Sequence, residues 1–181
     1  MDNYFRQLEK FYEQYQPEIY AYLYHQTGRK EIAEELCQDV FLKAYHGLPS
    51  YRGQASIKSW LYRIAHNHFV TWYRRETRYR MVPIKTELLH QLEADHDLPH
   101  KSLEQKEESE HVRRILNQLK TEFRTVLILR DIQELAYQEI ADILGWSLPK
   151  VKTTLHRARL QFRLDFEKYE QGQVVNQRRK G

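Results

Sequence analysis

The chain has 181 residues, of which 41% are hydrophobic and 30% charged, and its net charge is +4. This balance excludes an intrinsically disordered chain, and no apolar run approaches the ~20 residues that a membrane-spanning helix needs. The single cysteine, Cys37, excludes an internal disulfide, and the acidic, interrupted start MDNYFRQLEK does not predict a signal peptide, so we expect a cytoplasmic protein.

The predicted elements are helices throughout, because only six glycines and five prolines interrupt the chain and no useful strand alternation occurs. The fold class is therefore all-α. A polar, acidic stretch from residue 81 divides the chain into two small helical domains, and a surface loop within one domain is the alternative interpretation. The helices are expected at 3–26, 30–46, 56–80, 109–133, 136–144 and 148–169. The domains are expected at 1–80 and 108–170, with a linker at 81–107 and a flexible tail at 171–181.

Charge is unevenly distributed along these elements. Basic residues concentrate in 52–80 and 150–163, and acidic residues in 31–39 and 87–110. Separate basic and acidic surfaces suggest a polyanion as one partner and a different partner for the acidic surface.

The helix expected at 30–46 carries an acidic face. Glu35, Gln38 and Asp39 occupy one turn, and Leu42 lies near the same face. From the residues alone, a solvated acidic face and a docking surface for a basic partner both remain open.

The helix expected at 56–80 carries two stripes of rings. A core stripe at i, i+3, i+4 and i+7 spacing includes Ile57, Trp60, Leu61, Ile64, His68 and Trp72. A second stripe, roughly opposite, includes Tyr62, His66, Phe69 and Tyr73 and is flanked by Arg63, Asn67 and Arg74. Rings beside guanidinium groups suit the stacking of unpaired bases, so the second stripe indicates single-stranded nucleic acid. The alternative is that Tyr62 and Phe69 pack against a neighbouring helix.

The tripeptide His66-Asn67-His68 invites a metal-site interpretation. On a helix, however, the two histidines point about 200° apart, so they do not share a metal ion. No acids that would complete such a site lie nearby, and we expect no metal and no cofactor.

The segment 136–163 predicts a helix-turn-helix. Ile140, Ala141 and Leu144 form the inner face of a short helix, and Gly145 follows where a left-handed turn residue is needed. Trp146 fills the turn, Ser147 caps the second helix, Pro149 is tolerated in its first turn, and Val151 and Leu155 face inward. The outward or flanking positions carry Lys150, Lys152, Thr153, His156, Arg157 and Arg159, as reading of the major groove requires. An ordinary helical hairpin with a charged, solvated face is the alternative.

Three motifs in this order resemble the extracytoplasmic-function (ECF) sigma factors of bacteria over nearly the whole chain. AEELCQDVFLKAY is similar to their polymerase-docking segment, and SWLYRIAHNHFVTWYRR to the segment that melts and reads the −10 element. RTVLILRDIQELAYQEIADILGWSLPKVKTTLHRAR is similar to their −35-reading domain.

The resemblance implies a role for each group of residues. Docking on the clamp coiled coil of the largest polymerase subunit is implied for Glu35, Gln38, Asp39 and Leu42. Contact with the −10 element, including capture of a flipped base beside Asn67, is implied for Arg52, Trp60, Tyr62, Arg63, His66, Asn67, Tyr73 and Arg74. Contact with the −35 element is implied for Lys150, Lys152, Thr153, His156, Arg157 and Arg159. The implied partners are core RNA polymerase through its clamp and flap, promoter DNA, and an anti-sigma factor, which in this family is commonly membrane-anchored.

The chain departs from the family pattern at two places: Lys120 stands where the family usually has proline, and Pro149-Lys150 replaces a common glycine-threonine pair. Trp60-Leu61 stands where housekeeping sigma factors have paired tryptophans for melting, and ECF members generally share this weaker wedge. The recognition helix is therefore expected to start slightly differently, and the weaker wedge at Trp60 implies stringent promoter choice.

Two other function classes compete with this interpretation. A helix-turn-helix regulator that acts without polymerase leaves the aromatic stripe and the acidic face without a role. An enzyme acting on nucleic acid is not supported by any pair of carboxylates, nucleophile elbow or metal-ligand spacing, so we expect a protein that is not an enzyme.

Overall fold

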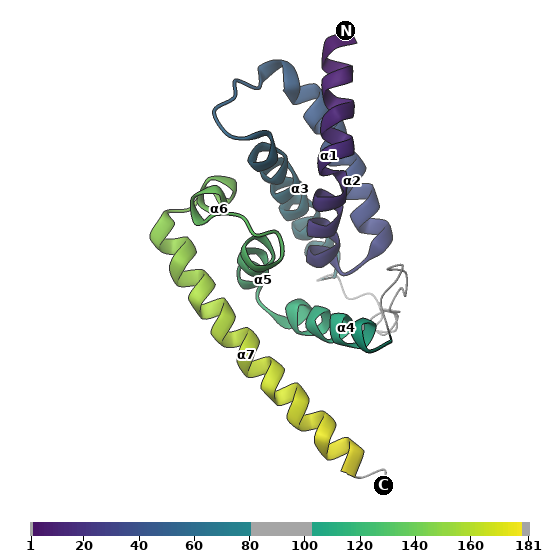
Figure 1. Cartoon of the computed structure of the whole chain (residues 1–181), viewed down its shortest axis with the longest axis vertical. Coiled ribbons are helices and arrows are strands. Elements are labelled where there is room, and N and C mark those ends of the chain that lie inside the picture. Colours follow the sequence, from purple (N-terminus) through teal and green to yellow (C-terminus); the bar gives the residue numbers. More distant parts are fainter. Residues whose placement is uncertain (1, 81–102, 179–181) are drawn as a thin grey trace.

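The computed structural model describes residues 2–80 and 103–178, and these residues form helices joined by short loops (Figure 1). The all-α fold with two helical domains is thereby confirmed. The N-terminal domain consists of α1 (Asp2–Thr27), α2 (Lys30–Gly47), a 3₁₀ turn (Leu48–Ser50) and α3 (Ile57–Arg80). The C-terminal domain consists of α4 (Leu103–Gln118), α5 (Thr121–Leu127), a π-helical turn (Ile128–Ile132), α6 (Tyr137–Leu144) and α7 (Leu148–Arg178). None of the described helices is long and apolar enough to span a membrane.

One predicted helix is wrong. The segment 109–133 is not continuous, because α4 ends at Gln118 and Lys120 adopts an extended conformation (φ −53°, ψ 141°) before α5 begins. Helix α4 also begins at Leu103, inside the segment assigned to the linker, and residues 81–102 of that segment lie outside the described residues. Helix α7 continues to Arg178, so most of the predicted tail is helical.

The N-terminal domain is built on an antiparallel pair, α1 and α2. The chain reverses between them at Gly28, whose φ of 69° lies in the left-handed region that favours glycine. Helix α3 covers both, and its Leu61 and Ala65 are fully buried. This packing leaves one side of α2 open to solvent.

The C-terminal domain holds α7 through a small apolar core. Val126 on α5 meets Leu155 and Ala158 on α7, and all three are buried. Gly145 ends α6 with φ 66°, as predicted for the turn of a helix-turn-helix, and the ring of Trp146 packs over this core. The opposite side of α7 is thus free to carry charge.

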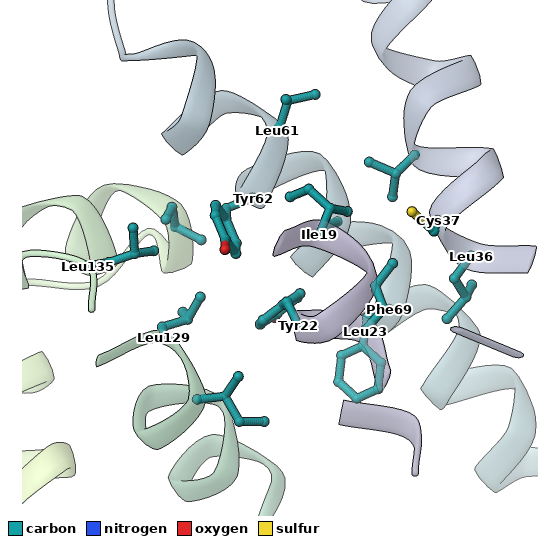
Figure 2. Close-up of a cluster of buried hydrophobic side chains, with 14 of the residues drawn as sticks. Ile19, Tyr22, Leu23, Leu36, Cys37, Leu61, Tyr62, Phe69, Leu129 and Leu135 are labelled. Atoms are coloured by element: carbon teal, nitrogen blue, oxygen red, sulfur yellow. The ribbon is translucent and has the colours of Figure 1, made fainter. Parts of the chain in front are cut away.

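The two domains pack against each other and share one hydrophobic core (Figure 2). Tyr22 on α1 and Tyr62 on α3 lie beside Leu129 and Leu135 of the C-terminal domain, and all four are buried. We call this contact the interdomain interface. The hydrogen bonds that cross it include Gln26 Nε2 to Thr125 Oγ1 (3.0 Å), Tyr62 Oη to Gln133 Oε1 (2.6 Å), Ser59 Oγ to Glu139 Oε1 (3.2 Å), Arg63 Nη2 to the Asp142 carbonyl (2.9 Å) and Arg113 Nη1 to Tyr24 Oη.

Candidate docking and nucleic-acid interfaces

The acidic face of α2 is open, as the sequence predicts. Glu35 and Gln38 are exposed, and Leu42 is 57% exposed although it is a large apolar side chain. Asp39 is partly buried, because its Oδ2 lies 2.9 Å from Nε2 of His68 on α3. An exposed leucine among acids has the composition of a docking surface for a basic protein partner, since interfaces have an apolar centre and a polar rim.

Of the four rings in the second stripe of α3, only Tyr73 is exposed to solvent, at 36%. Tyr62 and Phe69 are fully buried, so the packing alternative is right for these two rings, and their expected exposure is wrong in this conformation. The edge of Tyr62 contacts Tyr22 at 5.6 Å between ring centroids, and its hydroxyl donates to Gln133 of the C-terminal domain. Burial raises the pKa of Tyr62 above its usual value.

The other residues assigned to the −10 element differ in how far they are exposed and in what they contact. Asn67, Arg74, Arg52 and Tyr73 are exposed. Trp60 is partly buried and packs against the ring of Tyr51, with 5.0 Å between centroids. Arg63 is exposed, but one of its guanidinium nitrogens is bound to the carbonyl of Asp142 on α6. The C-terminal domain therefore forms hydrogen bonds with Tyr62 and Arg63 of this set.

His66 and His68 face different helices. His66 Nδ1 is hydrogen-bonded to Tyr22 Oη on α1 at 3.1 Å, and burial lowers the pKa of His66 to about 4. His68 is directed to Asp39 on α2. Among the residues that the structure describes, no three His, Cys, Asp or Glu side chains are grouped so that they could hold a metal ion.

The helix-turn-helix has the geometry predicted for it. Ser147 Oγ accepts a hydrogen bond from the Lys150 backbone N–H at 3.4 Å, which caps α7. Val151 and Leu155 are buried. The outer side of α7 carries the six exposed residues assigned to the −35 element: Lys150, Lys152, Thr153, His156, Arg157 and Arg159.

Two of those six side chains have partners within the protein. The ammonium group of Lys150 lies 3.8 Å from the centre of the Trp146 ring and 3.9 Å from Glu122 Oε1. Arg159 donates two hydrogen bonds to the Asp131 carboxylate, at 3.1 and 2.5 Å, which raises the pKa of Arg159. Nothing in the sequence signals this pair, because the two residues are 28 positions apart. Lys152, Thr153, His156 and Arg157 thus form the free basic face of α7.

Comparison with known families and proteins agrees with this geometry. Residues 11–79 match the family Sigma-70 region 2, and residues 109–162 match Sigma-70, region 4. The chain is 49% identical to RNA polymerase sigma factor YlaC of Bacillus subtilis over 162 residues, which cover 89% of this chain and 92% of YlaC. It is 31% identical to the ECF RNA polymerase sigma factor SigW of the same organism, over 80% of this chain and 81% of SigW.

Two solved structures share the fold. The first is the sigma factor RpoE in complex with the anti-sigma factor NepR from Bartonella quintana. Its TM-score is 0.73 at 23% identity, covering 90% of this chain and 98% of that one. The second is CnrH in complex with the cytosolic domain of CnrY, with a TM-score of 0.67 at 20% identity, covering 90% and 89%.

Proposed function

Because this chain belongs to the ECF RNA polymerase sigma factors, we propose that its three surfaces divide the work of promoter recognition. Helix α2 docks on core polymerase, α3 opens and reads the −10 element, and α7 reads the −35 element. A regulator that acts without polymerase is not favoured, because both sigma-70 regions match within the one chain. Sigma factors are transcription initiation factors, and the proposed location of this protein is the cytoplasm, where RNA polymerase acts.

The docking proposal is carried by the open acidic face of α2. Glu35, Gln38 and Leu42 are exposed on it, and Asp39 completes it at the side of α3. A basic coiled coil in the polymerase clamp is complementary to this face. Such complementarity steers the encounter and fixes the register more than it supplies affinity.

The −35 proposal is supported by the free basic face of α7. Arg157 and Lys152 suit guanine edges or phosphates, and Thr153 and His156 lie between them. Arg159 contributes less to the affinity for DNA than the sequence suggests, since Asp131 already neutralises its guanidinium group. Lys150, which touches Trp146 and Glu122, fits a phosphate contact beside the start of the helix.

The −10 proposal requires the interdomain interface to open. Asn67 is accessible for a flipped base, but Tyr62 is covered by Gln133 and Arg63 is bound to Asp142. The conformation described here is therefore a closed state, and polymerase or DNA is expected to bind a state in which the C-terminal domain has moved away from α3. A ligand shifts such an equilibrium only by its difference in affinity for the two states.

An anti-sigma factor is the proposed negative regulator. One solved structure that shares this fold is a sigma factor in complex with an anti-sigma factor, and another is CnrH in complex with the cytosolic domain of CnrY. A protein that binds the closed state more tightly than the open one would hold Tyr62 and Arg63 away from DNA.

Run-off transcription with bacterial core polymerase tests the proposed function. The chain is expected to produce discrete transcripts from a library of genomic fragments, and core polymerase alone is expected to produce none of them. A matched control is the chain with Lys152, His156 and Arg157 changed to alanine, which keeps α2 and α3 intact. Sequence-specific DNA binding without any transcript would favour the regulator instead.

A further inference from the structure

The contact between His68 and Asp39 joins α3, to which contact with the −10 element is assigned, to α2, to which polymerase docking is assigned. The side chain of His68 is only 16% exposed, whereas that of Asp39 is 48% exposed, and His68 Nε2 lies 2.9 Å from Asp39 Oδ2. His68 belongs to α3, and Asp39 belongs to the acidic face of α2. The imidazole is thus mostly buried, whereas the carboxylate that it contacts remains accessible to a partner.

The position of His68 argues against a chance surface pair. The residue lies on the stripe of α3 that includes Ile64 and Trp72, both of which pack against the hydrophobic core. An apolar residue would fill such a position without a polar partner, whereas a buried imidazole is costly unless it is hydrogen-bonded. The contact with Asp39 satisfies a ring nitrogen and fixes one carboxylate oxygen.

Fixing that oxygen has a consequence for docking. An aspartate on an open helix face samples several rotamers, and each side chain that is immobilised on binding opposes association. Glu35, by contrast, is exposed on the same helix, and no contact with α3 orders its carboxylate among the interactions described here. The two acids therefore differ in how far they are ordered before a partner arrives.

We propose that His68 is a positioning residue for polymerase docking: it holds the Asp39 carboxylate in the orientation that the basic surface of core polymerase meets. The proposal rests on the docking function proposed above for α2. It assigns a role in docking to a residue of α3 that itself lies largely below the surface.

The test is a double-mutant cycle measured as affinity for core polymerase. His68→Gln keeps a side-chain N–H long enough to approach Asp39, whereas His68→Asn is polar but too short, so the two form a matched pair. We expect His68→Asn to weaken binding to core polymerase roughly five-fold, and His68→Gln to bind nearly as tightly as the wild type. In the Asp39→Asn background, the difference between these two variants should disappear. In the Glu35→Gln background, it should persist unchanged.

Three other results have separate meanings. If Asp39→Asn and Glu35→Gln both leave core affinity unchanged, the docking function proposed for α2 is wrong. If both weaken binding but His68→Asn and His68→Gln bind as well as the wild type, the positioning role is overturned. A loss in His68→Asn of equal size in the Asp39→Asn and Glu35→Gln backgrounds would mean that His68 stabilises the N-terminal domain as a whole, which also overturns it. Urea unfolding of each variant, measured beside the affinities, shows whether the compared proteins are equally folded.

Discussion

Ser59 offers a way to open the interdomain interface with a single charge. Its hydroxyl lies 3.2 Å from Glu139 Oε1, and Ser59 is only 5% exposed. In Ser59→Asp, two carboxylates would meet at about 4 Å, which costs about 4 kcal/mol at an effective dielectric constant of about 20. Rotation of the two side chains away from each other reduces this to about 2 kcal/mol, or a shift of about 30-fold toward the open state.

Two measurements check this prediction. Small-angle X-ray scattering should show a larger radius of gyration for Ser59→Asp, and fluorescence anisotropy should show tighter binding of a single-stranded −10 oligonucleotide. The second substitution Glu139→Gln should reverse both effects, because it removes the repelling charge but keeps an acceptor for the Ala136 N–H, which Glu139 Oε2 binds at 2.9 Å. If Ser59→Asp leaves both quantities unchanged, the reasoning about the closed state is refuted.

Three further predictions concern the turn, a buried histidine and the recognition helix. Gly145→Ala should lower the free energy of unfolding in urea by about 1–2 kcal/mol, because the φ of 66° strains any residue with a Cβ. Among the described residues no atom lies within 4 Å of the added methyl group, so backbone strain is the only cost expected. Gly145→Asn should cost less, since asparagine tolerates this conformation better. Burial lowers the pKa of His66 from 6.5 to about 4, so between these pH values the unfolded chain binds a proton that the folded chain does not. The free energy of unfolding should therefore fall as the pH drops from 6.5 to 4, by at most about 1.4 kcal/mol per pH unit. In urea titrations at several pH values, His66→Phe should flatten this dependence. Arg157→Ala should relax preference at one position of a randomised −35 library, whereas Lys150→Ala should weaken all sites about equally and reduce the salt dependence.

The parts of the fold that were predictable are those set by local chemistry. Gly145 and Ser147 marked the end of α6 and the start of α7, since a left-handed turn and an N-cap each require particular residue types. The acidic face of α2 was predictable for the same reason, because helical spacing alone brings Glu35 and Gln38 together.

The break at Lys120 and the burial of Tyr62 were not predictable in this way. Lys120 is neither glycine nor proline, so no local signal ends α4; the adjacent Leu119 is buried within the C-terminal core. Tyr62 is covered by Gln133, which is 71 positions away, and helical periodicity carries no information about such a contact. The resemblance to ECF sigma factors gave the order of the surfaces, but not the closed state in which two of the proposed −10 residues are held.

Arg124 limits how durable the closed state can be. It is only 7% exposed at the edge of the interface, where Nη1 donates to Asn117 Oδ1 at 3.3 Å and Nε has no hydrogen-bond partner. Burial lowers the pKa of Arg124, and the nearby Tyr73 and Tyr22 offset this shift only in part. A buried cation that pairs with no carboxylate among the described residues is costly to desolvate, whereas an apolar side chain of similar size is often better tolerated. We therefore expect Arg124→Met to lengthen the lifetime of the closed state and to slow its activation by polymerase, which would mean that the wild-type arginine favours release of the C-terminal domain from α3.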